Sequence, residues 1–312
     1  MSTTGVTEGG RVLSIQSHVV RGYVGNKSAV FPLQLLGFDV DPILSVQFSN
    51  HTGYGSWRGE AMNGDQLWAL IEGLEANDLM QYTHILTGYI GSVSFLQTIV
   101  RVVSKLREYN PNLVYVCDPV MGDQGKLYVP KDLVPAFSQV VAGASLLTPN
   151  QFEAELLTGM KIRTTADALE ACRLLHDQGP QSVVITSMDL ETEDGNEDLY
   201  LSILGSTRVV QDEGCPSQFI IRVRRIPSYF TGTGDLLAAL LLAWTSRQPR
   251  DLAGAASKAL CSLQGVLQRT AQGHSNGSPS MASRELKLIQ SREEIISPPG
   301  AEAMGVQIHA LE

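Results

Sequence analysis

Residues 231–244 read TGTGDLLAALLLAW, a glycine-rich turn followed at once by an apolar segment. Glycines let the chain turn with several backbone N–H groups pointing the same way, and the first N–H groups of a helix lack partners within it. We therefore expect an anion-binding turn, suited to phosphate, at the start of a helix over Asp235–Thr245. A helix that is apolar all round is buried, which brings this turn into the interior of the protein.

Asp235 is the acid of this turn, and two interpretations of it stay open. Its carboxylate could accept a proton from a hydroxyl that attacks a phosphate, or it could be an ordinary first-turn acid that the helix dipole stabilises by about 0.3–1 kcal/mol. The helix N-terminus is expected to lower the pKa of Asp235. Phosphoryl transfer tolerates such a weak base, because its loose transition state needs little early deprotonation of the nucleophile.

The chain before this turn alternates between short β-branched runs and longer helical patterns. We expect strands over Val12–Ile15, Ile43–Phe48, Ile85–Thr87, Leu113–Cys117, Leu146–Thr148 and Val183–Thr186. We expect helices near 25–36, 65–77, 92–109, 131–141, 151–158 and 166–178. This alternation predicts an α/β fold with three layers, α/β/α, around a central and mostly parallel sheet.

The pattern changes after Met188, where strand-like pieces are separated by turns. The pieces Leu199–Leu204 and Phe219–Val223 are expected to be antiparallel edge strands. Further expected elements are an acidic turn over 191–196, a helix over Leu252–Arg269, a loop over 271–281 and a strand over Leu286–Gln290. Because no convincing linker is visible, we expect a single domain over 11–312 that follows a disordered tail over 1–10.

Polar residues follow all six expected parallel strands. They are Gln16–His18, Ser49–Tyr54, Thr87–Tyr89, Asp118–Pro119, Thr148–Asn150 and Thr186–Ser187. In open parallel sheets, ligands bind outside the carboxyl ends of the strands, where such loops converge. Loops of this kind are also polar for other reasons, and Ser, Thr, Asp and Asn cap the next helix. Six consecutive loops together favour a ligand crevice.

Three acids near strand ends, Asp118, Asp123 and Glu153, are candidates to bind metal-associated ATP. Asn150 and Glu153 lie three residues apart at a helix start, which fits a ligand pair but equally a capping box. The sequence has no GxxxxGK[ST], HRD or DFG motif, which argues against P-loop and protein-kinase folds. Residues 21–26 (RGYVGN) fail the GxGxxG spacing, which argues against a nicotinamide cofactor.

Composition narrows the partners and the compartment. The 312 residues include 23 Lys and Arg against 32 Asp and Glu, a net charge of −9 that argues against nucleic acid as a partner. Two uncharged stretches, Leu79–Val100 and Leu133–Phe152, contain too many polar residues to span a membrane. Four isolated cysteines and the absence of a signal-like N-terminus lead us to expect a reducing, cytoplasmic location.

Several longer motifs resemble a known group of kinases. GTGD before an apolar helix, VCDPVMGD (116–123) and TPNQFEAE (148–155) are similar to motifs of the ribokinase-like superfamily. Within it, the N-terminal stretches over 14–40 and 45–54, together with LTGY (86–89), closely resemble the pyridoxal kinases. This resemblance covers about Arg11 to Arg269. It implies a ribokinase-like fold and ATP-dependent phosphorylation of the 5′-hydroxymethyl group of pyridoxal, pyridoxine and pyridoxamine, the reaction of vitamin B6 salvage.

The resemblance also implies roles for individual residues. Asp235 is implied as the catalytic base, and Gly232, Thr233 and Gly234 as the anion hole. The implied vitamer-binding residues are Ser17, which would hydrogen-bond the pyridine ring, Val24, Val46, Thr52 and Tyr89. The implied nucleotide-binding residues are Asp118, Asn150, Thr186, Ser187, Thr233, Gly234 and, on the adenine side, Ile226, Pro227 and Ser228.

Two kinds of cation and a partner chain complete what the resemblance implies. Asp118, Asp123 and Glu153 would help to place Mg2+, and Asp118, Thr148 and Thr186 would bind a monovalent cation, K+ or Na+. The loop over 119–131 would cover the site, and the chain would form a homodimer. Two rivals remain: a hydroxymethylpyrimidine-type kinase of the same superfamily, and a catalytically silent protein that binds vitamin B6.

Overall fold

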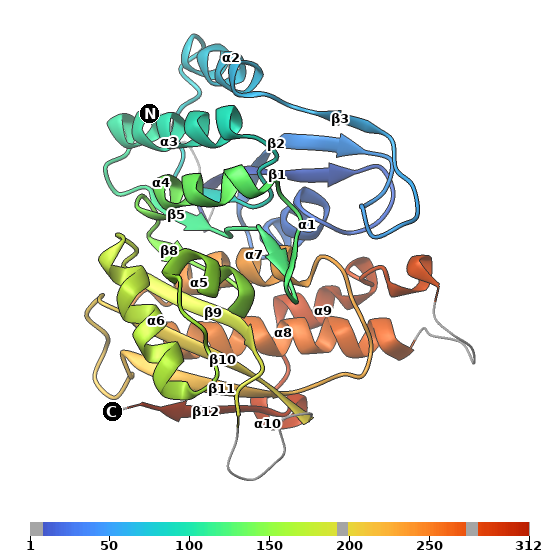
Figure 1. Ribbon diagram of the computed structural model, residues 1–312, viewed down its shortest axis with the longest axis vertical. Coiled ribbons are helices and arrows are strands. Elements are labelled where there is room, and N and C mark those ends of the chain that lie inside the picture. Colours follow the sequence, from blue (N-terminus) through green and yellow to red (C-terminus); the bar gives the residue numbers. More distant parts are fainter. Residues whose placement is uncertain (1–8, 192–198, 273–279, 312) are drawn as a thin grey trace, which may run out of the picture.

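The computed structural model describes residues 9–191, 199–272 and 280–311 (Figure 1). Ten strands form one sheet in the order β12-β11-β10-β9-β8-β5-β4-β1-β2-β3. They are β1 Arg11–Val19, β2 Asp39–Phe48, β3 Gly59–Ala61, β4 His84–Thr87, β5 Val114–Cys117, β8 Leu146–Leu147, β9 Ser182–Met188, β10 Tyr200–Thr207, β11 Gln218–Arg224 and β12 Val306–Ala310. All neighbouring strands from β2 to β9 pair in parallel.

The antiparallel strands lie at both ends of the sheet. β10, β11 and β12 extend it beyond β9, and β3 pairs with β2 at the opposite edge (Figure 1). The predicted α/β fold with antiparallel edge strands is thus confirmed. The sequence did not predict β3 and β12. β3 has only three residues, all exposed, and β12 follows a four-residue helix, so neither gives a clear hydrophobic periodicity.

Helices cover both faces of the sheet. They are α1 Asn26–Leu35, α2 Gly64–Glu75, α3 Val93–Tyr109, α4 Phe137–Val141, α5 Gln151–Thr158, α6 Thr165–Asp177, α7 Thr233–Arg247, α8 Leu252–Gln272, α9 Arg292–Ile296 and α10 Ala301–Met304, with short 3-10 helices η1 Lys131–Ala136, η3 Met281–Arg284 and η4 Ile289–Ser291. None of the helices in the described part of the chain is long and apolar enough to cross a membrane.

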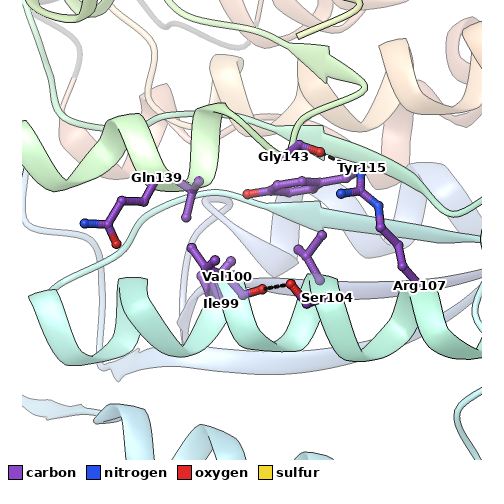
Figure 2. Close-up of a pocket in the computed structure, with 9 residues that line it drawn as sticks. Ile99, Val100, Ser104, Arg107, Tyr115, Gln139 and Gly143 are labelled. Carbon is purple, nitrogen blue, oxygen red and sulfur yellow. Dashed lines mark hydrogen bonds between the residues drawn. The ribbon is translucent and has the colours of Figure 1, made fainter. Parts of the chain in front are cut away.

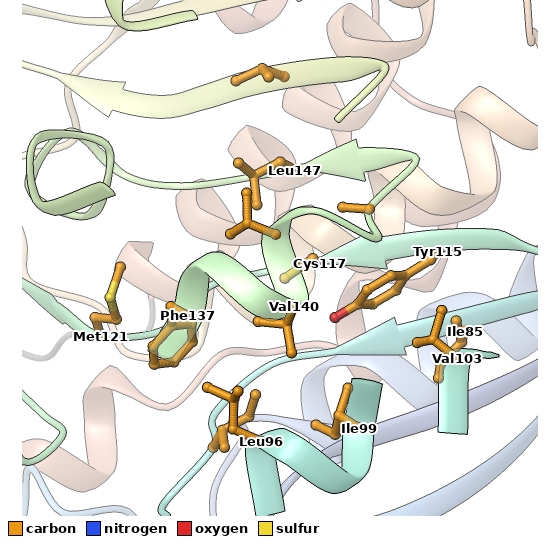
Figure 3. Packing of buried hydrophobic residues seen from close by; sticks show 14 of the residues in the cluster. Ile85, Leu96, Ile99, Val103, Tyr115, Cys117, Met121, Phe137, Val140 and Leu147 are labelled. Carbon is orange, nitrogen blue, oxygen red and sulfur yellow. The ribbon is translucent and has the colours of Figure 1, made fainter. Parts of the chain in front are cut away.

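Two hydrophobic cores lie between the sheet and its two helical layers. Along β1, Leu13 and Ile15 contribute to one core with α2 to α6, whereas Val12 contributes to the other with α1, α7 and α8. The alternation follows from the two-residue period of a strand. Figure 3 shows the first core, where α3 and α4 pack side chains such as Ile99 and Val140 against the strands. The three-layer arrangement leaves the carboxyl ends of the parallel strands free of helix packing.

Two expected elements differ in the structure. The expected helix over 131–141 is split into η1 and α4, and Pro135, which has no N–H to donate, lies in the 3-10 part. The expected strand over Leu286–Gln290 is wrong. Leu286 and Leu288 are buried in the second core, but the N–H of Lys287 donates to Thr270 Oγ1 and the chain enters η4.

Other expected segments lie partly outside the described residues. These are 1–8 of the N-terminal tail, 192–196 of the acidic turn and 273–279 of the loop before η3. The segment expected to cover the site contains a hairpin of β6 Gly122–Asp123 and β7 Lys126–Leu127.

Candidate active site

The glycine turn precedes α7 and lies against the loop between β1 and α1. Gly232, the N-cap residue of α7, has φ 82°, a left-handed conformation that favours glycine. A methyl group on Gly232 would come within 2.1 Å of the carbonyl oxygen of Tyr23. Residues 236–244 of α7 are all buried, as the apolar sequence predicts. The turn is therefore held at a fixed place by a buried helix.

Asp235 faces the start of α1. Its half-buried carboxylate accepts a hydrogen bond from the backbone N–H of Gly25, the N-cap residue of that helix. Burial raises the pKa of Asp235, and the Gly25 hydrogen bond only partly opposes it. The expected lowering of this pKa is therefore wrong, because removal of the carboxylate from water outweighs the favourable helix end. A raised pKa makes Asp235 a better proton acceptor than the sequence suggests.

Gly25 also touches Ser17, the residue expected to bind the ring. Gly25 has φ 52°, and a methyl group on it would lie 2.1 Å from the carbonyl oxygen and 2.4 Å from the hydroxyl of Ser17. The β1–β2 pairing shifts register between Gln16 and His18, so Ser17 lies at an irregularity of the ladder. Such irregularities re-aim side chains near active sites. One glycine thus separates the expected base from the expected ring-binding hydroxyl.

The other expected vitamer-binding residues lie nearby in the fold but differ in exposure. Val46 lies near the carboxyl end of β2, and Tyr89 follows the carboxyl end of β4; these strands are the two neighbours of β1. Val24 and Val46 are buried and Tyr89 is half-buried, and Ser45 Oγ donates to the Tyr89 carbonyl at 2.8 Å. Thr52 lies in the β2–β3 loop, where its side chain is exposed.

Acidic side chains gather beyond β5. Asp118 is buried, and a methyl group on Gly234 would lie 3.7 Å from its Oδ2. Burial and the charges of Glu153 and Asp235 hold the pKa of Asp118 well above its usual value. Carboxylates that disfavour one another's ionisation in this way suit a site that a cation neutralises.

Glu153 and Asn150 form the capping box that the sequence left as an alternative. Glu153 Oε2 accepts from the Asn150 N–H, and Asn150 Oδ1 accepts from the Glu153 N–H, both at 2.9 Å. Asn150 Nδ2 also donates to the Gly122 carbonyl at 2.8 Å, and Glu153 Oε1 accepts from the Met121 N–H at 2.9 Å. Burial raises the pKa of Glu153 to about 8 despite these bonds.

The remaining expected cation ligands lie at neighbouring strand ends. Asp123 of β6 is half-buried, and burial raises its pKa. The hydroxyls of Thr148 and Thr186 each donate, at 3.4 Å, to a carbonyl oxygen, of Cys117 and Pro149 respectively. In the described part of the chain, no three His, Cys, Asp or Glu side chains are arranged to bind a metal by themselves. These oxygens fit a hard cation that takes further ligands from phosphate and water.

Ile226, Pro227 and Ser228 lie between β11 and the glycine turn. Ile226 is partly buried against the second core, Pro227 is exposed, and Ser228 is half-buried with its N–H on the Ile226 carbonyl at 2.7 Å. Ser187, in β9, is half-buried as well. Tyr128, beside the hairpin, is a further residue near Asp123 and Glu153 that no sequence motif indicates, and burial and the neighbouring Tyr229 raise its pKa.

A small cavity lies away from these residues. Its volume is about 50 Å³, and it lies between α3 and α4, where Arg107 donates to the Gly143 carbonyl at 2.7 Å (Figure 2). Its lining is Ile99, Val100, Val103, Ser104, Arg107, Tyr115, Gln139, Val140 and Gly143. None of the candidate site residues contributes to this lining.

Comparisons with known proteins identify the family of this chain. A family model described as phosphomethylpyrimidine kinase matches residues 75–280. Pyridoxal kinase of Arabidopsis thaliana is 58% identical over 93% of this chain and 92% of its own. Pyridoxal kinase of Homo sapiens is 49% identical over 92% of this chain and 96% of its own.

A solved structure is similar throughout. Pyridoxal kinase from Leishmania donovani, in complex with ADP and pyridoxamine, superposes with a TM-score of 0.87 at 36% identity. The similarity covers 97% of this chain and 99% of that one. Because identity and fold agree over nearly the full chain, this protein belongs to the pyridoxal kinase family.

Proposed function

We propose that this enzyme transfers the γ-phosphoryl group of ATP to the 5′-hydroxymethyl group of pyridoxal, pyridoxine and pyridoxamine. The observation that carries the proposal is the position of Gly25, which contacts Ser17, the expected ring-binding residue, and hydrogen-bonds Asp235, the expected base. The Leishmania relative, which binds ADP and pyridoxamine, has the same fold. A vitamer ring held at Ser17 would present its hydroxymethyl group towards Asp235.

The vitamer site would use the ends of β1, β2 and β4. Val24 and Val46 would supply an apolar wall and Tyr89 a half-buried aromatic surface, while Ser17 and Thr52 would orient the polar edge of the ring. Small-molecule sites generally combine such apolar walls with a few placed polar groups.

The nucleotide would occupy the ends of β5, β8 and β9. N–H groups of Gly232, Thr233 and Gly234 would receive the charge that develops on the transferred phosphoryl group. Asp118, Asn150, Thr186, Ser187 and the segment Ile226–Ser228 would flank the nucleotide. Asn150 would do so from a side chain already engaged with Glu153 and Gly122, so its role would be to shape the loop.

Two cations fit the acidic end of the site. Asp118, Asp123 and Glu153 would help to hold Mg2+, which supplies charge that neutralises the phosphates. Glu153 would act mainly through the loop that it caps, since it already accepts N–H groups of Asn150, Met121 and Gly122. Asp118 would, together with Thr148 and Thr186, bind the K+ or Na+ ion. The β6–β7 hairpin would exclude water from the phosphates.

Asp235 would orient the attacking hydroxyl and take its proton late in the reaction. Its raised pKa supports this role, since the proton must rest on the carboxylate after the P–O bond forms. We further propose a cytoplasmic homodimer, in which residues 11–312 act as a single domain; the single ten-stranded sheet supports the domain assignment.

The test is turnover by the purified protein with MgATP, a potassium salt and pyridoxal, followed by formation of pyridoxal 5′-phosphate. Hydroxymethylpyrimidine is the competing substrate, because the matching family model carries a phosphomethylpyrimidine kinase description. A higher kcat/KM for pyridoxal supports the proposal, and a higher value for the pyrimidine replaces it. Tight pyridoxal binding without turnover of either substrate would identify a silent B6-binding protein.

A further inference from the structure

Glu285, in the C-terminal segment, bonds to two loops, over 22–25 and 51–54, that contain expected vitamer-binding residues. Its Oε2 accepts the Tyr23 N–H at 2.8 Å, and its Oε1 accepts the Tyr54 hydroxyl at 3.0 Å. His51 Nε2 lies 3.3 Å from the same Oε1. The side chain of Glu285 is only 12% exposed. A carboxylate from the C-terminal segment therefore has three donors from two loops near β1 and β2.

The contact of His51 with Gly53 determines which ring nitrogen donates to Glu285. Its Nδ1 accepts the Gly53 N–H at 3.1 Å, so the ring proton must lie on Nε2. Nε2 is therefore the ring nitrogen that donates to Glu285. Burial alone would raise the pKa of Glu285, but the hydrogen bonds from His51, Tyr23 and Tyr54 hold that pKa below its usual value.

The two loops carry the expected vitamer contacts. Tyr23 immediately precedes Val24 and Gly25, and His51 and Tyr54 flank Thr52. The first loop approaches the carboxylate so closely that a methyl group on Gly22 would lie 2.5 Å from Glu285 Oε1. A displacement of Glu285 would therefore alter the positions of both loops.

Glu285 is itself held by the core. Two of the three residues that follow it, Leu286 and Leu288, are fully buried in the second core, which α8 also lines. Lys287 adds a backbone bond to Thr270 of that helix at 3.1 Å. Side chains anchored in this way position a site more accurately than loop contacts alone.

We infer that Glu285 is a positioning residue for the vitamer site. It holds the loops over 22–25 and 51–54 together, so that Val24 and Thr52 face the ring and Gly25 keeps its N–H on Asp235. This inference rests on the proposed function. It assigns a role to the C-terminal segment, for which the sequence offers none, and it predicts that loss of Glu285 weakens vitamer binding more than ATP binding.

The test is Glu285→Gln in the full-length enzyme. Glutamine has one acceptor oxygen and one NH2 donor, so it cannot accept from Tyr23, Tyr54 and His51 together. Because hydrogen bonds to a charged group are strong, we expect KM for pyridoxal to rise about tenfold. KM for ATP should stay within about twofold, because among the described residues none of the expected nucleotide contacts bonds to Glu285.

Glu294→Gln is the matched control. Glu294 pairs with Arg269 and is similarly buried, at 17% against 12% for Glu285, but it lies on α9 and contacts no vitamer loop among the described residues. It should leave both KM values unchanged. Equal rises of KM for pyridoxal and ATP in Glu285→Gln, or no rise for pyridoxal, would overturn the inference.

Tyr54→Phe keeps the test valid if Glu285→Gln does not fold. It removes one donor to the carboxylate and should raise KM for pyridoxal severalfold, with no added effect in the Glu285→Gln background. An unchanged KM would again count against the inference. Absence of turnover by the wild-type enzyme would instead reject the proposed function, and the role of Glu285 with it.

Discussion

The backbone N–H of Gly25 donates a hydrogen bond to the carboxylate of Asp235, which ties the start of α1 to the start of α7. The two residues are far apart in the sequence but belong to adjacent, packed helices. Gly25 also touches Ser17 at the end of β1. The geometry of the candidate catalytic base therefore depends on a glycine whose importance no motif indicates.

Gly25→Ala tests this dependence. The Cβ of alanine would collide with Ser17, and alanine would have to adopt the positive φ that Gly25 has. We therefore expect a loss of about 1–3 kcal/mol in unfolding free energy and little remaining turnover. Urea unfolding and steady-state kinetics measure the two effects.

Gly37→Ala is the control for Gly25→Ala. Gly37 also has a positive φ, of 86°, but an added Cβ meets no described atom within 4 Å. It should cost about 1 kcal/mol of backbone strain and leave activity intact. Equal effects of the two variants would show that contact with Ser17 has no part in the site.

The buried carboxylates predict how stability depends on pH. The folded state raises the pKa of Glu153 to about 8, and that of Asp118 also rises, so the folded protein binds more protons than the unfolded chain above the ordinary carboxyl pKa. Their contribution is fully present at low pH and is lost as pH rises towards 8. In cation-free buffer, each group lowers the unfolding free energy by at most about 1.4 kcal/mol per pH unit.

Comparison with Glu153→Gln isolates that contribution from other titrating groups. The wild-type unfolding free energy should fall more steeply between pH 5 and about 8 than that of the variant. K+ or Mg2+ should reduce the wild-type slope, because a bound cation favours the ionised carboxylates. Parallel curves for the two proteins would mean that Glu153 is ionised throughout this range.

The apolar helix after the turn should matter for stability as a whole. Leu240 in α7 is fully buried, so Leu240→Ala is expected to cost about 2–5 kcal/mol of unfolding free energy. Leu70 in α2 is 45% exposed, and Leu70→Ala should cost less than about 1 kcal/mol. Similar midpoints of thermal unfolding for both variants would contradict the buried position of α7.

The parallel part of the fold could be predicted from sequence, because β-branched runs and helical periods are local signals. The run around Val183 and the GTGD turn before Leu236 are examples, and the structure has a strand and a helix there. The strand predicted around Leu286 was wrong, because alternating burial is found both in a strand and in an irregular segment such as this one, which is bonded to Thr270.

The candidate site was predictable in its parts but not in its connections. Asp118 and Asp235 stand out by motif, and the capping box of Glu153 was an open alternative. The sign of the pKa shift of Asp235 was missed, because burial is a property of the assembled fold. Glu285 was missed because its three donors come from residues more than 200 positions away.

The most direct test of the central claim is Asp235→Asn, assayed with MgATP and pyridoxal beside the wild-type enzyme. Asparagine keeps the size of the side chain but cannot take the proton, so kcat should fall by about 10²–10⁴-fold while the pyridoxal dissociation constant stays nearly unchanged. Loss of turnover with retained binding is the predicted result. Turnover close to wild type would contradict the assignment of Asp235 as the base.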